Sequence, residues 1–566
     1  MNIPTQKNRL FLLLAAHLVL GPALPASAVL EFPWVIGDHM VLQRGKPVPI
    51  WGWDDPGQKV TVTLGKATAT TTAGKNGKWL VTLPARQAGG PHTITITGSN
   101  KVELKDILFG EVWVCSGQSN MGWPLKRSVP HERKEIVGAD LPGFRLVKVP
   151  NVMAVKPLGD DRAAVGLGVY GKQADIKETP LMPRPADRPA TAEAEGAGWQ
   201  DCNKESARHY TGVGYFFGRE LYKELKVPVG LIHASWGGSK VEPWIPPSGY
   251  ESVPALKENA ETLARQLSKP FNNTAPTVMF NGELHPLLPY AIRGAIWYQG
   301  ESNGNEGDSY TLKMKALVNG WRKEWKQGDF PFYFVQLPNY VAHGGGNLPP
   351  DSDPEGGNGW ARIREAQAKV PARVKNTGMA VTIDVGESGN IHPSNKYDVG
   401  RRLALLALAR DYGRKDLVDS GPIYKSMKAH GNRIELSFEQ VGGGLMAARK
   451  SPMRERENAE PIASLDGLRL AGANPERPKP VDKLDGFAIA GVDRKWHWAE
   501  AVIEGDKVIV SSPEVPKPVA VRYGFSANPG RCSLYNREGL PTAPFRTDDW
   551  KFLRYTDHTL GRIVQE

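Results

Sequence analysis

Short runs of alternating apolar and polar residues fill the chain between residues 31 and 108, and Gly, Asn and Pro separate these runs. The clearest runs are residues 48–53, 59–64 and 92–97. Alternation with a period of two places one face of a β-strand toward a core and the other toward water. The pattern therefore predicts a small antiparallel β-sandwich over residues 29–108.

Beyond residue 109 the pattern changes, because short continuous apolar runs now alternate with longer segments of helical period. Strands that alternate with helices are typical of a parallel sheet covered by helices. We therefore expect an α/β domain over residues 109–412. Its expected strands are residues 112–115, 229–234, 294–298, 332–336 and 379–384, and its expected helices are residues 215–225, residues 311–325 and one that starts after Asn395.

One segment inside this domain lacks such periodicity. Residues 126–198 are rich in Pro, Gly and charged residues, which predicts a long loop insertion over one face. Such loops often shape the access of a substrate, and a purely surface role stays open as well.

Alternation returns after residue 413. Residues 433–438, 507–511 and 519–523 each read as a strand with one buried face. We expect a second β-rich domain over residues 413–566.

The first 28 residues have the pattern of a secretory signal peptide. Lys7 and Arg9 precede the apolar run 10–16, and the small residues Ala-Ser-Ala at positions 26–28 form a cleavage site. The apolar run is shorter than the roughly 20 residues that span a bilayer. The sequence therefore predicts a secreted or periplasmic protein with no integral membrane segment after cleavage of the leader.

Composition narrows the function classes. The net charge is +11, but Lys and Arg are scattered along the chain, which indicates a solvated surface and not a nucleic-acid site. With only three cysteines a disulfide framework is excluded, while a bridge between Cys115 and Cys202 stays open. Neither Cys nor His has the spacing of a zinc site, so we expect no metal and no cofactor. Nothing in the sequence indicates an oligomeric state.

Candidate chemistry lies where predicted strands end. Ser119, Gly237, Gln299 and His392 each follow such an end. In open parallel sheets ligands bind at the carboxyl ends of the strands, so these four segments are expected to meet in one cleft. A serine hydroxyl needs a hydrogen-bonded base and donors for the developing oxyanion, and the four segments contain all of these parts.

The segments around these residues resemble, in order along the chain, the signature blocks of the sialate O-acetylesterase family within the SGNH hydrolases. The resemblance runs from about residue 31 to residue 411. It implies a flavodoxin-like three-layer α/β/α domain flanked by β-sandwich domains, and hydrolysis by water of O-acetyl esters on a glycan, without a metal. The matching blocks are residues 38–43, 111–121, 234–239, 285–287, 297–303 and 391–405.

The resemblance also implies residue roles. Ser119 is the expected nucleophile, Ser116 a structural hydroxyl before the turn, and His392 the general base that later acts as the acid. The expected oxyanion hole consists of the backbone N–H of Ser119, the N–H of Gly237 or Gly238, and the side chain of Gln299 or Asn303.

The third member of the triad departs from the wider superfamily, which has an aspartate three residues before the histidine. That position is Gly389 here. Related carbohydrate acetylesterases use the glutamate that corresponds to Glu301, so Glu301 is our first expectation. Asp384 and Glu387 are alternatives, and a dyad of serine and histidine alone stays open.

The expected function is removal of O-acetyl groups from carbohydrates through an acetyl-serine intermediate, as in a sialate O-acetylesterase. An acetylxylan esterase, or another polysaccharide acetylesterase, would use the same machinery. An alternative of another class is a non-catalytic glycan-binding protein, which the missing aspartate favours.

Overall fold

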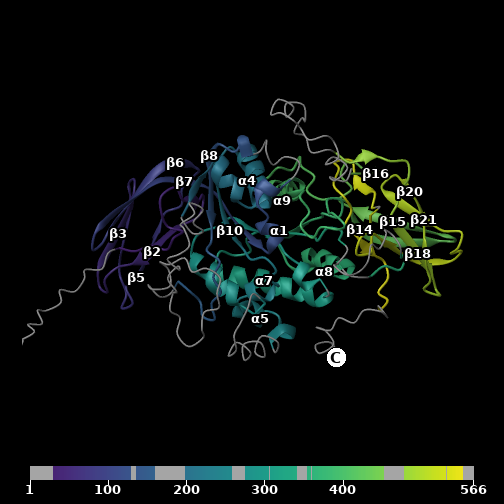
Figure 1. Ribbon diagram of the computed structural model, residues 1–566, viewed down its shortest axis with the longest axis horizontal. Coiled ribbons are helices and arrows are strands. Elements are labelled where there is room, and N and C mark those ends of the chain that lie inside the picture. The colour runs from purple at the N-terminus through teal and green to yellow at the C-terminus, as the bar shows by residue number, and fades with distance from the viewer. Residues whose placement is uncertain are drawn as a thin grey trace, which may run out of the picture.

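The computed structural model describes residues 30–128, 136–159, 198–257, 274–304, 306–340, 353–357, 360–450, 477–530 and 532–551. The predicted signal peptide, residues 1–28, lies outside these ranges. Figure 1 shows strands of the N-terminal part at one end of the molecule, helices around a sheet in the middle, and C-terminal strands at the other end. Among the described residues, no helix has both the length and the apolar character that a membrane span requires.

The central sheet has the strand order β13-β12-β11-β7-β10-β8-β9. All its neighbouring pairs are parallel except β8 with β9. After β7 the chain adds β8, β9 and β10 on one side of that strand and then β11, β12 and β13 on the other side. The direction in which strands are added therefore reverses between β7 and β11. Open α/β sheets bind ligands at such a reversal. The strands are β7 (Lys101–Gly117), β8 (Leu141–Lys148), β9 (Gln200–Cys202), β10 (Val229–Ser235), β11 (Gly294–Tyr298), β12 (Phe332–Val335) and β13 (Thr377–Ala380).

Helices cover both faces of this sheet (Figure 1). On one face the ring of Trp113 in β7 lies 5.1 Å from that of Phe217 in α4, and its indole N–H donates to the Tyr412 hydroxyl at 3.0 Å, just after α9. On the other face Trp297 in β11 packs 6.1 Å from Trp321 in α7. The helices are α4 (Gly212–Leu225) and α9 (Lys396–Asp411) on the first face, and α5 (Pro247–Glu251), α7 (Asp308–Trp325) and α8 (Trp360–Arg373) on the second, with the shorter α1 (Ser119–Gly122) and α3 (Lys204–His209).

Strand β7 is shared between this sheet and the N-terminal strands. Residues 101–109 pair with β6, and residues 111–117 pair with β10 and β11. The boundary expected at residue 108 therefore falls inside one continuous strand. The other N-terminal strands are β1 (Val41–Gln43), β2 (Val48–Trp53), β3 (Lys59–Leu64), β4 (Ala67–Thr72), β5 (Lys78–Leu83) and β6 (Gly89–Thr97).

The C-terminal strands form two main sheets, with the orders β14-β15-β21-β20 and β19-β18-β22-β24. Ile434, Leu436, Val508, Ile489 and Val521 are among the residues of an apolar core that is separate from that of the central domain. The strands are β14 (Ile423–His430), β15 (Arg433–Glu439), β16 (Leu445–Arg449), β17 (Lys479–Pro480), β18 (Phe487–Gly491), β19 (Trp496–Trp498), β20 (Glu500–Glu504), β21 (Lys507–Ser511), β22 (Pro518–Tyr523), β23 (Leu534–Asn536) and β24 (Phe545–Arg546).

The structure corrects the expectation for residues 126–198. Strand β8 lies inside that segment, while residues 129–135 and 160–197 lie outside the described residues. Residues 144–147 are all buried, so the strand lacks the alternation of a half-exposed strand, and Pro142 and Gly143 further hide it. Strand β13 ends at Ala380, and residues 381–384 leave the sheet. Cys115 and Cys202 are both buried and free, so the bridge left open is not formed.

Candidate active site

Gly117 makes the turn that carries the candidate nucleophile. Its φ is 138°, and a Cβ at this position would lie 2.1 Å from the carbonyl oxygen of Tyr298 on the neighbouring strand. The next residue, Gln118, donates its backbone N–H to that same oxygen at 3.0 Å. Glycine thus lets β7 and β11 approach closely at their carboxyl ends, and Ser119 follows directly as the first residue of α1.

Ser119 and His392 lie side by side although 273 residues separate them in sequence. The Nε2 atom of His392 lies 2.8 Å from Oγ of Ser119. The imidazole stacks on the indole of Trp123 with a centroid distance of 4.6 Å and an interplanar angle of 12°. Burial, together with the cations of Lys396 and Arg127, lowers the pKa of His392 below its ordinary value of 6.5. The imidazole is therefore neutral at pH 7 and can accept the proton of the hydroxyl.

Glu387 organises the loop that carries His392, through hydrogen bonds to residues on both sides of the histidine. One carboxylate oxygen accepts hydrogen bonds from the N–H of Ser394 at 2.8 Å and from its hydroxyl at 2.6 Å. The other oxygen accepts from the amide of Asn390 at 2.8 Å. The side-chain oxygen of Asn390 in turn accepts the backbone N–H of His392 at 3.0 Å. The glutamate thus fixes the loop on both sides of the histidine.

The other two candidate acids are also bonded elsewhere. Asp384 forms a bidentate pair with Arg402, with bonds of 2.6 and 2.7 Å. Glu301 accepts a hydrogen bond from Nδ2 of Asn120 at 2.5 Å, and burial raises the pKa of its carboxyl. Within the described ranges, the Nδ1 atom of His392 has no hydrogen-bond partner. The structure therefore does not support Glu301, Asp384 or Glu387 as a direct partner of the imidazole.

Two residues of the site were not singled out in the sequence. Asn120 is completely buried, and its Nδ2 also donates to the carbonyl of Ile391 at 2.9 Å. The Nζ atom of Lys396 donates to Oδ1 of Asn120 at 2.5 Å. Both residues lie inside sequence blocks that resemble the family. Each is a polar residue next to an apolar segment, and that position was the signal by which the sequence could have indicated a role in the site.

Gly237 follows β10 and lies beside the nucleophile. A Cβ on Gly237 would be 3.6 Å from Cβ of Ser119, and the N–H of Trp236 donates to the carbonyl of Gly117 at 3.1 Å. Gly238 has a φ of 73°, which glycine adopts without strain. Backbone amides of this segment thus come close to Ser119.

The side chains of Gln299 and Asn303 point into a buried network. Nε2 of Gln299 donates to the carbonyl of Ser239 at 3.2 Å and to Oδ1 of Asn303 at 2.8 Å. Nδ2 of Asn303 donates to Glu242 at 3.1 Å and to Glu306 at 2.9 Å. Both side-chain amides have committed their two N–H groups, so the expectation that either one stabilises an oxyanion is not supported by this geometry.

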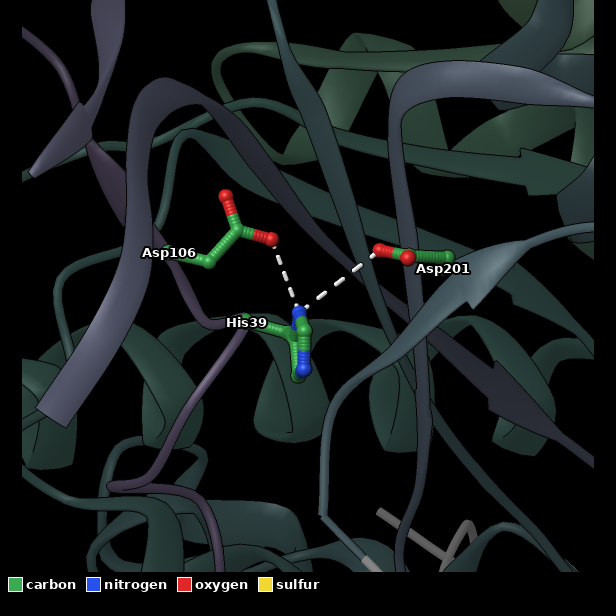
Figure 2. Close-up of side chains that lie close together, drawn as sticks. All are labelled: His39, Asp106 and Asp201. Atoms are coloured by element: carbon green, nitrogen blue, oxygen red, sulfur yellow. Dashed lines mark hydrogen bonds and ion pairs between the residues drawn. The ribbon is translucent and has the colours of Figure 1, made fainter.

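In the part of the chain that the structure describes, one group of side chains has donor atoms close enough to hold a metal ion, namely His39, Asp106 and Asp201. Figure 2 shows His39 pointing toward both carboxylates, and we call this group the His39 cluster. The guanidinium of Arg145 already forms ion pairs with Asp106 and Asp201. One guanidinium therefore already pairs with both carboxylates. Asp106 lies in the first half of β7, away from Ser119. Its residues fit an ion-pair cluster better than a metal site.

Comparison with known proteins identifies the family of the chain. Residues 185–409 match the family of carbohydrate esterases described as sialic acid-specific acetylesterase. The human sialate O-acetylesterase is 32% identical over 471 residues, which cover 76% of this chain and 82% of that protein. The sialate O-acetylesterase of Rattus norvegicus is 30% identical over 496 residues, covering 77% and 83%. A crystal structure of a carbohydrate acetylesterase from Xanthomonas citri is 34% identical, with a TM-score of 0.72 over 92% of this chain and 100% of that one. The chain belongs to the sialate O-acetylesterase family and is a carboxylic ester hydrolase.

Proposed function

We propose that this protein is a serine esterase that removes O-acetyl groups from a glycan through an acetyl-serine intermediate. The observation that carries the proposal is the 2.8 Å contact between Nε2 of His392 and Oγ of Ser119. The lowered pKa of His392 supports it further, because a base must be unprotonated before it can act.

In the first half of the reaction, His392 takes the proton of the Ser119 hydroxyl while Oγ attacks the acetyl carbonyl carbon. The backbone N–H of Ser119, with that of Gly237 or Gly238, would donate to the oxyanion. Collapse of the tetrahedral intermediate breaks the bond to the sugar oxygen, and the imidazolium returns its proton to that oxygen. The products of this half are a free sugar hydroxyl and acetyl-Ser119.

In the second half, a water molecule gives a proton to His392 and attacks the acetyl group. A second tetrahedral intermediate collapses with cleavage of the bond to Oγ, and His392 returns the proton to that oxygen. Acetic acid leaves and ionises to acetate in solution. The imidazole would be held by its stack on Trp123 and by the loop around it. We therefore propose a dyad of Ser119 and His392 in which Glu301 acts only through Asn120.

The finer features of the fold are part of the same proposal. Helices on both faces of the sheet and the reversal of strand order between β7 and β11 support a flavodoxin-like three-layer SGNH domain over residues 109–412. The separate apolar core of the C-terminal strands supports a domain over residues 413–566. The leader pattern in residues 1–28 supports export, so we propose a secreted or periplasmic location.

The experiment that tests the proposal compares the wild type with Ser119→Ala. Acetate release is measured from an aryl acetate and from a panel that includes O-acetylated sialic acid and acetylated xylan. We expect release by the wild type, none above background by the variant, and an acetyl adduct on Ser119 by mass spectrometry after rapid quenching. A folded wild type that binds the glycans without releasing acetate would overturn the proposal in favour of a glycan-binding protein.

A further inference from the structure

The amide of Asn120 joins three parts of the chain that meet at the site. Asn120 belongs to α1 and follows the candidate nucleophile. Its Nδ2 donates to Glu301, just after β11, and to the carbonyl of Ile391, the residue before His392. Its Oδ1 accepts from Nζ of Lys396, the first residue of α9. One buried side chain, next to Ser119 in the chain, thus contacts the residue before His392 and a lysine four residues after His392.

Lys396 is an unusual residue for its place. Its side chain is completely buried, and its ammonium lies over the ring of Tyr298 at 5.4 Å from the centroid. Burial lowers the pKa of Lys396 to about 7 although the carboxylates of Glu301 and Glu387 oppose that shift. An apolar side chain would fill the same space without the loss of hydration, so packing alone does not account for the lysine.

We propose that Lys396 is a positioning residue, which holds Asn120 so that the loop bearing His392 stays in register with Ser119. This inference rests on the function proposed above. Without the bond from Nζ, the Asn120 amide would be free to rotate, and its bonds to Glu301 and to the Ile391 carbonyl would weaken together. Displacement of a catalytic group by about 1 Å can lower turnover on the order of 100-fold.

A second effect separates this role from simple packing. Burial lowers the pKa of the His392 imidazole most, and among the described residues the cations of Lys396 and Arg127 lower it further. Removing the cation at Lys396 removes one of these influences, so the pKa of His392 rises. Since the neutral imidazole is the active form, the acidic limb of the kcat/KM profile then moves to higher pH.

The experiment compares Lys396→Met with Lys46→Met. Lys46 is a matched control at the opposite end of β11, where Nζ donates to the carbonyl of Ile292 at 2.7 Å and to Gln327 at 3.1 Å. Partial burial lowers the pKa of Lys46 to about 8, so the two lysines share chemistry but not location. Acetate release is measured as kcat and KM across pH, and folding by circular dichroism.

We expect Lys396→Met to lower kcat by about 10- to 100-fold with little change in KM, and to move the acidic limb upward, while Lys46→Met keeps the wild-type profile. Wild-type kcat and an unmoved limb in Lys396→Met would overturn the inference. So would equal losses in both variants, because they would indicate a general effect of removing a buried lysine.

Lys396→Met leaves the buried carboxylate of Glu301 without its nearby cation, which can prevent folding. The double variant Lys396→Met with Glu301→Gln removes both charges, and we expect it to fold while kcat stays reduced. Wild-type turnover in the double variant would overturn the inference. Failure of the proposed function looks different, because the wild type would then lack acetate release or Ser119→Ala would retain it.

Discussion

Replacing Asp384 by asparagine separates a structural role of this carboxylate from a role in the triad. The exposed fractions of the Asp384 and Arg402 side chains are 2% and 5%, so their two hydrogen bonds lie almost completely out of water. Removing one partner of a buried pair typically costs about 3–5 kcal/mol, because the other charge stays buried without compensation. We expect Asp384→Asn to lower stability by that order.

Activity distinguishes the two roles. Removing the carboxylate that orients a catalytic histidine lowers kcat by about ten-thousandfold. The bonds of Asp384 run to Arg402 and not to His392, so we expect a far smaller loss of kcat/KM at a temperature where the variant is folded. The assays are the unfolding transition followed by circular dichroism, and acetate release from an aryl acetate.

A control isolates the charge from the shape of the pair. The double variant Asp384→Leu with Arg402→Met replaces both charges by apolar groups, and we expect it to recover much of the lost stability. A ten-thousandfold loss of kcat in an Asp384→Asn protein whose unfolding curve matches the wild type would refute the reasoning. It would mean that Asp384 acts on the imidazole during the reaction.

Three further expectations concern pH, backbone geometry and metals. Burial and nearby cations lower the pKa of His392. We therefore expect kcat/KM to rise with pH along an acidic limb whose midpoint lies below pH 6.5. A midpoint above pH 6.5 would contradict the assignment of His392 as the base. In Gly117→Ala, the new Cβ would lie 2.1 Å from the Tyr298 carbonyl oxygen at a φ of 138°. We expect this change to lower the free energy of unfolding by at least about 1–3 kcal/mol and to displace the serine turn. The matched control Gly328→Ala, with a φ of 72° and open space around the Cβ, should retain wild-type kcat/KM in the same assay. Dialysis against a chelator should leave kcat/KM unchanged, since Arg145 already pairs with both carboxylates of the His39 cluster. A loss of activity that Zn²⁺ restores would contradict this expectation.

Buried parallel strands were the most predictable part of the fold. Residues 294–298 were expected as a strand and form β11 with the same bounds. A short continuous apolar run between turn residues is typical of a buried strand. Strand β8 was hidden by the Pro and Gly near its start. Helix α8 was not predicted, because charged residues are interspersed among its apolar positions and Pro371 stands near its end. Such elements take their stability from neighbours that the local sequence does not reveal.

The site residues whose positions follow from the ends of the parallel strands could be predicted from the sequence. Ser119 and His392 could be paired from sequence because each follows a strand of one parallel sheet. The competition for hydrogen bonds could not be predicted: Gln299 looks like a donor for an oxyanion in the sequence, yet its two N–H groups are committed to neighbours. The same holds for Glu301, whose partner is Asn120. The hydrogen-bond partners of a buried polar group are determined by residues that are distant in sequence, so the local sequence does not indicate whether its N–H groups are already bonded.

The shared strand β7 has a consequence for how the enzyme folds. Its first half is completed by β6, whereas its second half needs β10 and β11, which follow more than 100 residues later in the chain. We therefore expect the N-terminal strands and the central sheet to unfold together, and a cut near residue 108 to disrupt both. A destabilising change in the first hundred residues would be felt at the serine turn at the far end of the same strand, whereas the C-terminal strands, with a core of their own, could lose structure independently.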